Sequence, residues 1–368
     1  MASKADIRTQ AQALLARFQM AGAEVVEADI LQPADILLDL YGEDMRARAF
    51  VTADPLRGEM MLRPDFTVPV VRMHMDGGEA PARYAYMGEV FRKQEHEVGR
   101  PAEYLQAGFE IFDKGDPAEA DAEVFALFTE MLAPLGLRAA TGDIGILRAA
   151  VQGLSTTDRR KAALMRHIWR PRRFRAMFDR FAGRVPQPEA RAELVRQVDA
   201  QGLATLMEQR APAIGLRSVA EVESRVAVLR HDMAAPPIPA AQAEVLDHIL
   251  DLRETSENAL EHLRDAAVDL PSLAEAVARV ERRMEALAAR GIDMARLDFE
   301  VTYGRTNMEY YDGFVFGFYA EGHPDLPPIA TGGRFDALTR ELGQGAECPA
   351  VGGVIRPALM LAVTEGAT

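Results

Sequence analysis

The chain has 368 residues, of which 48% are hydrophobic and 27% are charged, a composition that excludes disordered, collagenous and disulfide-scaffold proteins. Its 42 basic and 56 acidic residues give a net charge of −14, which argues against a general polyanion binder. The single cysteine, Cys348, excludes an internal disulfide and a cysteine-based zinc site and fits a reducing, cytoplasmic location.

The N-terminal part predicts alternating helices and strands. We expect an amphipathic helix over 5–21, ended by Gly22, and a hairpin over 50–63 whose turn contains Pro55 and Gly58. Two strands are expected over 82–92 and 103–112, followed by a helix over 119–136. No apolar run approaches the roughly 18 residues that a membrane span requires. The N-terminus lacks the apolar segment of a secretion signal, so we expect no membrane association.

The middle of the chain, from about residue 150 to 290, is rich in Ala, Arg and Glu and has helical periodicity. Ser272 and Glu275 have the spacing of a capping box, and the helix that follows carries an apolar stripe typical of helix packing. The stripe consists of Leu273, Val277, Val280, Met284 and Leu287. Pro236, Pro237 and Pro239 predict a break in this region.

Strand patterns return over 297–303, 310–319 and 329–335. We therefore expect residues 1–150 and 291–368 to form one domain with a shared sheet, and residues 151–290 to form a helical insertion. Within this insertion, residues 159–184 contain ten Lys or Arg and a single acid, Asp179. This stretch predicts either contact with an acidic or polyanionic partner or a solvated helical face.

The strand expected over 104–112 carries an informative pattern. Its side chains alternate, so Gln106, Gly108 and Glu110 share one face while an apolar set occupies the other. If that polar face is buried, it requires a polar partner and predicts the floor of a small-ligand site, with Gly108 leaving space above the sheet. The alternative is a solvent-facing sheet surface.

Other polar residues lie near predicted strand ends. Arg92 ends the preceding strand and could bind a carboxylate or phosphate. Asp65 and Thr67 follow the hairpin and could bind an ammonium group, or they could belong to an ordinary turn or helix cap. Downstream, the 309–312 and 331–335 segments look strand-like. Glycines in the second would permit close approach of a backbone or a ligand, or mark a bulge.

Six ordered blocks resemble the histidyl-tRNA synthetase family. They are LRPDFT (62–67), YMGEVFR (86–92), YLQAGFEIF (104–112), NMEYYDGFVF (307–316), TGGRFDAL (331–338) and PAVGG (349–353). The resemblance covers most of residues 1–150 and 297–368. It implies an α+β fold of the class II aminoacyl-tRNA synthetase type, which is an antiparallel sheet flanked by helices.

The resemblance also implies a set of histidine-binding residues. Asp65, Thr67 and Gln106 match contacts to the α-amino group, and Glu110 and Tyr311 match contacts around the imidazole. Tyr310 adjoins them. Arg92 matches the motif 2 arginine, which meets the substrate carboxylate and the ATP α-phosphate.

The residues that would catalyse adenylation depart from the family pattern. The acid of the motif 2 FRxE sequence is Gln94, and the arginine that precedes the tyrosine pair is replaced by Thr306, with Arg305 one residue out of register. The motif 3 Glu-Arg pair falls on Ala358 and Leu359, and Arg356 lies three residues early. Because fixed cations supply most of the stabilisation in phosphoryl chemistry, these changes predict a binding protein rather than a ligase.

A synthetase-like chain with these losses, and with no room before Thr368 for an anticodon-binding domain, resembles the regulatory subunits of ATP phosphoribosyltransferase. That resemblance implies no catalytic residues, no cofactor, no metal and no tRNA partner. It implies a short-form catalytic subunit as partner in a hetero-octamer, self-association as a dimer, and L-histidine as feedback effector of the first step of histidine biosynthesis. Two alternatives remain open. One is a catalytically active synthetase-like ligase or tRNA-modifying relative, and the other is a structural partner with a vestigial pocket.

Overall fold

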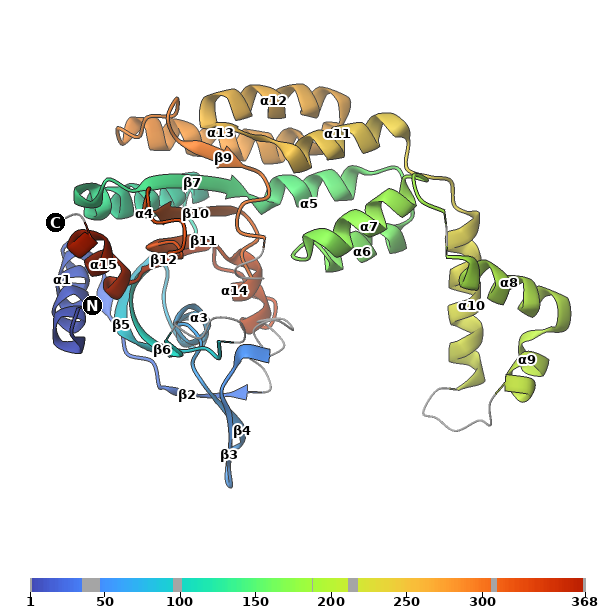
Figure 1. The fold of residues 1–368 in the computed structure, drawn as a ribbon, viewed down its shortest axis with the longest axis horizontal. Coiled ribbons are helices and arrows are strands. Elements are labelled where there is room, and N and C mark those ends of the chain that lie inside the picture. The colour runs from blue at the N-terminus through green and yellow to red at the C-terminus, as the bar shows by residue number, and fades with distance from the viewer. Residues whose placement is uncertain are drawn as a thin grey trace.

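The computed structural model describes residues 2–34, 47–94, 101–186, 188–210, 218–305 and 310–366. A large sheet with helices on both sides forms the body of the molecule (Figure 1). Three helices stand apart from it as an arm: α8 (Glu189–Gln201), α9 (Leu203–Arg210) and α10 (Val219–Ala234). Among the described residues, no helix has the length and apolar character needed to cross a membrane.

The central sheet contains strands from both ends of the chain, as predicted. Its spatial order is β1 (Glu24–Val25), β5 (Ala82–Phe91), β6 (Glu103–Phe112), β12 (Ala350–Ile355), β11 (Ala330–Arg334), β10 (Phe314–Tyr319), β7 (Arg138–Asp143), β9 (Asp298–Glu300) and β8 (Arg253–Thr255). Neighbouring strands are antiparallel except for the outer pairs β1–β5 and β7–β9. The predicted class II antiparallel sheet is therefore confirmed.

One face of the sheet is covered by α1 (Lys4–Met20) and α4 (Pro117–Leu132). The alternation in β6 sends Phe109 toward this face, where it stacks on Phe18 with ring centroids 5.5 Å apart. Phe125 and Phe128 of α4 pack against Phe316 of β10. This apolar layer holds one side of β6 in place, so the polar side of the strand faces the candidate site.

The opposite face is covered by α3 (Thr67–Met75) and, further along the sheet, by α5 (Ile144–Gly153). The predicted hairpin is confirmed as β3 (Val51–Asp54) and β4 (Gly58–Leu62), which pair with β2 (Leu31–Pro33) in a small separate sheet. At the hairpin turn, the Asp54 carboxylate accepts hydrogen bonds from the backbone N–H groups of Leu56 and Arg57.

The region between β7 and β9 is mainly helical, as predicted. Its helices are α5, α6 (Asp158–Arg166), α7 (Pro171–Phe181), α8 (Glu189–Gln201), α9 (Leu203–Arg210), α10 (Val219–Ala234), α11 (Ala240–Asp251), α12 (Ser256–Asp269) and α13 (Ala274–Ala289). The proline-rich break lies between α10 and α11. Strand β8, however, belongs to the central sheet, and α13 packs on α4. The limits 151–290 remain a prediction, and these contacts favour a narrower insertion that ends before α11.

Two local predictions are wrong. Ser272 does not cap α13, because its hydroxyl donates to the carbonyl of Ala149 and α13 begins after a 3-10 turn over Pro271–Leu273. The strand expected over 310–319 begins only at Phe314, so the predicted strand position of Tyr310 and Tyr311 is wrong as well. The apolar stripe of α13 is buried, as its packing role predicts.

The helix predicted over 119–136 is confirmed with slightly earlier limits. Asp116 accepts a hydrogen bond from the Ala118 N–H group and caps α4 at its N-terminus. A short 3-10 turn follows α4, and Gly136 ends it with φ at +58°, a left-handed conformation that favours glycine. The chain then enters β7, which lies between β10 and β9 in the sheet.

Candidate functional site

A cavity of about 720 Å³ lies between the start of β6, the start of α3 and the segment before β10. Six of the seven predicted histidine-binding residues line it. They are Asp65, Thr67, Arg92, Gln106, Tyr310 and Tyr311. The fold therefore brings together side chains that are up to about 245 positions apart in the sequence. Their role in binding histidine stays a prediction.

Gln106 lies in the floor of this cavity. Its side chain is 1% exposed, and its Oε1 atom has no hydrogen-bond partner among the described residues. Glu110, two pleats further along β6, is also fully buried. The alternative of a solvent-facing sheet surface is therefore wrong. A buried carbonyl acceptor without a partner is costly, and a ligand donor in the cavity would satisfy it.

Asp65 connects the two halves of the site. Its Oδ1 atom lies 3.5 Å from the N–H group of Val68 in the first turn of α3, and the hydroxyl of Tyr310 donates to Oδ2 over 3.4 Å. Asp65 is 2% exposed. Its carboxylate therefore lies at the wall of the cavity, where an ammonium group would find a buried negative charge.

Glu110 lies beneath the cavity rather than in its wall. It is not among the lining residues, and its Oε1 atom accepts a 2.9 Å hydrogen bond from the hydroxyl of Tyr86. Its Oε2 atom has no hydrogen-bond partner among the described residues. Burial raises the pKa of Glu110 to about 8, although the hydroxyls of Thr67 and Tyr86 oppose the shift. Glu110 is therefore mainly protonated at neutral pH.

Gly108 has a different role from the one predicted. A Cβ atom at this position would lie 2.3 Å from the ring of Tyr86, which stands opposite Gly108 in the β5–β6 pairing. The Tyr86 ring also stacks on Phe66, with centroids 4.4 Å apart. The space above Gly108 is thus filled by a tyrosine that reaches Glu110, and this part of the prediction is wrong.

Three arginines, Arg48, Arg92 and Arg356, line the cavity. The Nε atom of Arg92 donates to the carbonyl of Pro64 over 2.8 Å, which orients the side chain across the cavity wall. Arg356, at the end of β12, donates to the carbonyl of Pro328 over 2.7 Å and to the hydroxyl of Thr331 over 3.2 Å. Within the described residues Arg356 has no carboxylate partner, and its burial lowers its pKa.

Sequence reasoning set Arg356 aside because it precedes the expected motif 3 arginine position by three residues. The sequence does contain an indication that Arg356 belongs to the site. Arg356 directly follows Ile355, the last residue of β12, and the end of a strand next to a polar sheet face is a common position for a binding residue. The positions expected to hold the Glu-Arg pair, Ala358 and Leu359, also line the cavity. The cavity wall is therefore apolar where a synthetase would carry charge.

Arg305 points away from the site. Its Nε atom donates to the carbonyl of Ile168 over 2.6 Å, and its guanidinium lies 4.9 Å from the centre of the Phe174 ring. Desolvation lowers the pKa of Arg305 to about 10. Arg305 is not a cavity-lining residue, in agreement with the predicted register shift. Thr306 lies outside the described residues.

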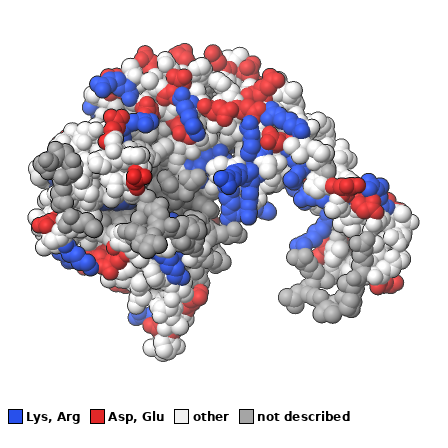
Figure 2. All heavy atoms as spheres, in the orientation of Figure 1, with Lys and Arg blue, Asp and Glu red and all other residues white. Residues whose placement is uncertain are grey.

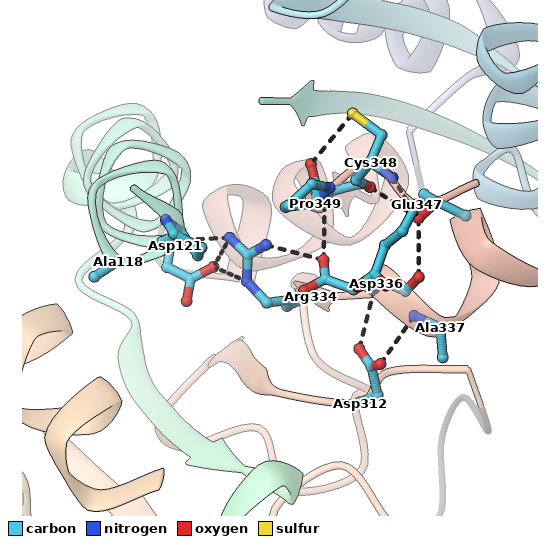
Figure 3. A network of polar contacts seen from close by, with 12 residues as sticks. Ala118, Asp121, Asp312, Arg334, Asp336, Ala337, Glu347, Cys348 and Pro349 are labelled. Carbon is cyan, nitrogen blue, oxygen red and sulfur yellow. Dashed lines mark hydrogen bonds and ion pairs between the residues drawn. The ribbon is translucent and has the colours of Figure 1, made fainter. Parts of the chain in front are cut away.

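A buried ionic network holds the segment that carries the tyrosines. Arg334 of β11 pairs with Asp121 of α4 and with Asp336 (Figure 3). The carboxylate of Asp312 accepts hydrogen bonds from the backbone N–H groups of Asp336 and Ala337. Because Asp312 directly follows Tyr311, this network fixes the turn that places Tyr310 and Tyr311 at the cavity. Burial raises the pKa of Asp312 to about 6.

The two glycines before Arg334 lie in a regular strand. A Cβ at Gly332 would lie 2.4 Å from the carbonyl oxygen of Gly352, and one at Gly333 would lie 2.6 Å from that of Phe314. The predicted close approach of a backbone is confirmed, and the alternative of a bulge is wrong. Among the described residues, no cluster of three or more His, Cys, Asp or Glu side chains could hold a metal ion.

Comparison with known proteins places this fold and site in a family. The family model described as "Histidyl-tRNA synthetase" matches residues 2–234 and 217–358. A solved structure from Bacillus halodurans, titled as an ATP phosphoribosyltransferase regulatory subunit/histidyl-tRNA synthetase, has a TM-score of 0.64 and 21% identity. The match covers 97% of this chain and 79% of that one. A histidine–tRNA ligase subunit from Alicyclobacillus acidocaldarius has a TM-score of 0.58, with 22% identity over 98% of this chain and 93% of that one.

The fold and the site thus define a class II aminoacyl-tRNA synthetase-like protein of the histidyl type. Similarity to curated proteins identifies a narrower family. The protein of Brucella anthropi described as "ATP phosphoribosyltransferase regulatory subunit" is 35% identical over 92% of this chain and 93% of its own length. That of Brucella canis is 33% identical over 90% of each chain. The chain belongs to the family of ATP phosphoribosyltransferase regulatory subunits.

Proposed function

We propose that this chain is a non-catalytic, cytoplasmic subunit that activates a short-form ATP phosphoribosyltransferase catalytic subunit in the first step of L-histidine biosynthesis. It also makes that step sensitive to L-histidine. The catalytic subunit joins ATP to phosphoribosyl pyrophosphate, and this chain supplies the effector site. The proposed assembly is a hetero-octamer in which this chain also self-associates as a dimer.

The observation that carries the effector site is the unpartnered Oε1 atom of Gln106, in the cavity that the Asp65 carboxylate also lines. An α-ammonium group would donate to both acceptors. The carboxylate of the same ligand would then have Arg92 and Arg356 within the same cavity. A free amino acid carries both charges, so it matches this arrangement better than a neutral metabolite does.

The charges at particular positions around the cavity support the proposed absence of catalysis. Adenylation places negative charge on a phosphorus centre and requires fixed cations around it. Ala358 and Leu359 supply none, and Arg305 is held against Ile168 and Phe174. The retained polar floor and the lost cations together support binding without activation.

Feedback requires L-histidine to bind two states of the assembly unequally, with a coupling free energy of typically about 1–3 kcal/mol. The Tyr310–Asp65 contact joins the segment before β10 to the start of α3. A ligand in the cavity would alter this contact. The resulting shift of α3 would transmit ligand binding to the surface of the chain.

The amino-acid site is tested with L-histidine and L-histidinol, which lacks the carboxylate. Arg92→Met should weaken binding of L-histidine to the isolated chain by about tenfold or more, because a charged hydrogen bond is lost. Binding of L-histidinol should change by less than about twofold. Isothermal titration calorimetry measures both. An equal loss of affinity for the two ligands would show that Arg92 has only a structural role. Failure of the parent chain to bind L-histidine would contradict the proposed effector site.

A further inference from the structure

The basic stretch over 159–184 is not explained by the effector site. It forms α6, α7 and the connection between them. Arg160 is buried and pairs with Asp232. Arg175 and Arg184 both pair with Asp179 and Asp247. These three arginines stabilise the helical region internally.

Other arginines of the same stretch remain exposed. Arg166 ends α6, and Arg172 and Arg173 lie in the first turn of α7. Within the described part of the chain, none of the three has a carboxylate partner. We call this group, Arg166, Arg172 and Arg173, the α6–α7 corner. The helices are joined by residues 167–170, so the three exposed arginines lie close together along the chain.

The position of the corner does not favour helix stability. The first turn of α7 contains no acidic residue, and no side chain caps the helix. The N-terminal end of a helix carries partial positive charge, so arginines in its first turn are unfavourable there. An anionic partner would interact favourably with both the arginines and the exposed N–H groups of this turn.

Figure 2 shows the surface around α6 and α7. Lys and Arg side chains gather where α6 and α7 lie in Figure 1, beside the hollow between the body and the arm formed by α8–α10. The hollow is therefore bordered by a positive surface, whereas the chain as a whole has a net charge of −14. The negative charge of the rest of the molecule would repel a long polyanion such as a nucleic acid. The local positive surface therefore favours an anionic partner that contacts only this region.

We propose that the α6–α7 corner is a docking surface for an acidic patch on a protein partner, namely the catalytic subunit. The proposal rests on the function proposed above. Three exposed arginines suit such a surface, because a guanidinium binds a carboxylate through two parallel hydrogen bonds and arginine is enriched in protein interfaces. The acidic patch would enter the hollow beside α6 and α7.

The test uses the full chain and a short-form catalytic subunit. We expect the affinity of the parent chain, measured by biolayer interferometry, to fall as NaCl rises from about 0.05 to about 0.5 M. Arg172→Glu/Arg173→Glu should weaken association by about tenfold or more at low salt. The matched control, Arg57→Glu/Arg296→Glu, makes the same charge change at exposed arginines elsewhere and should change affinity by less than about twofold.

Two further measurements separate the possible outcomes. L-Histidine binding by Arg172→Glu/Arg173→Glu should equal that of the parent, which shows that the variant is folded. Equal association of this variant and the parent would overturn the docking surface while leaving the proposed function intact. Loss of tRNA binding by the variant, with subunit association unchanged, would also overturn it. If the parent chain does not associate with the catalytic subunit at all, the proposed function fails with it.

Discussion

Asp65→Asn should raise the L-histidine concentration that half-inhibits the reconstituted complex by about tenfold or more, because the ligand ammonium would lose a charge-assisted hydrogen bond. Activity without L-histidine should remain close to that of the parent, since chemistry takes place on the partner. Asparagine keeps an acceptor for the Val68 N–H group, so the start of α3 should be preserved. Inhibition curves of phosphoribosyl-ATP formation measure both quantities.

The control for this variant is Asp116→Asn. Asp116 also accepts a hydrogen bond from a backbone N–H group at the start of a helix, but it does not line the effector cavity. The Asp116→Asn variant should therefore have the same inhibition curve as the parent. Parent-like inhibition of Asp65→Asn would show that Asp65 caps α3 and does not contact the effector.

Glu110→Gln should stabilise the chain at alkaline pH. The native pKa of Glu110 is about 8 and its ordinary value is 4.5. Between these values the native chain holds a proton that the unfolded chain releases. The free energy of unfolding therefore falls as pH rises through this window. The glutamine side chain would remove this dependence and keep an acceptor for the Tyr86 hydroxyl. The gain at pH near 8 should be on the order of a few kcal/mol.

Urea unfolding at pH near 5 and near 8 measures this effect. Glu103→Gln is the matched control, because Glu103 begins the same strand but is exposed. The parent and the control should show the same decline in stability toward pH 8, and Glu110→Gln should show a smaller one. Identical pH dependence in all three proteins would contradict a raised pKa of the buried Glu110 carboxyl group.

The sequence predicted the polar face of β6 because alternation in a strand requires only local information. The sequence could not predict that Glu110 is buried beneath the cavity, since its burial depends on the residues of the neighbouring strand. Tyr86 fills the space above Gly108 only because the β5–β6 register sets these residues opposite each other. That register pairs two strands that are not contiguous in the sequence, and alternation within one strand does not by itself specify which residue of the other lies opposite.

Tertiary contacts also account for the local errors. The Ser272 spacing is that of a capping box, but a carbonyl of α5, that of Ala149, competes for the hydroxyl. The aromatic run around Tyr310 and Tyr311 looks like a strand, but the hydrogen bonds of Asp312 hold it in a turn. Arg356 was set aside on motif spacing, whereas its place at a strand end carries it into the cavity. Spacing along a motif does not report where a side chain points.

The rate of phosphoribosyl-ATP formation by a short-form catalytic subunit, measured with and without this chain and L-histidine, tests the central claim most directly. We predict a rate that is low for the catalytic subunit alone, rises when this chain is added, and falls again with L-histidine. This chain alone should form no histidyl-adenylate from ATP. A rate that does not change when this chain is added, or rapid histidyl-adenylate formation by the chain itself, would contradict the claim that the chain is a regulatory subunit that binds the amino acid without activating it.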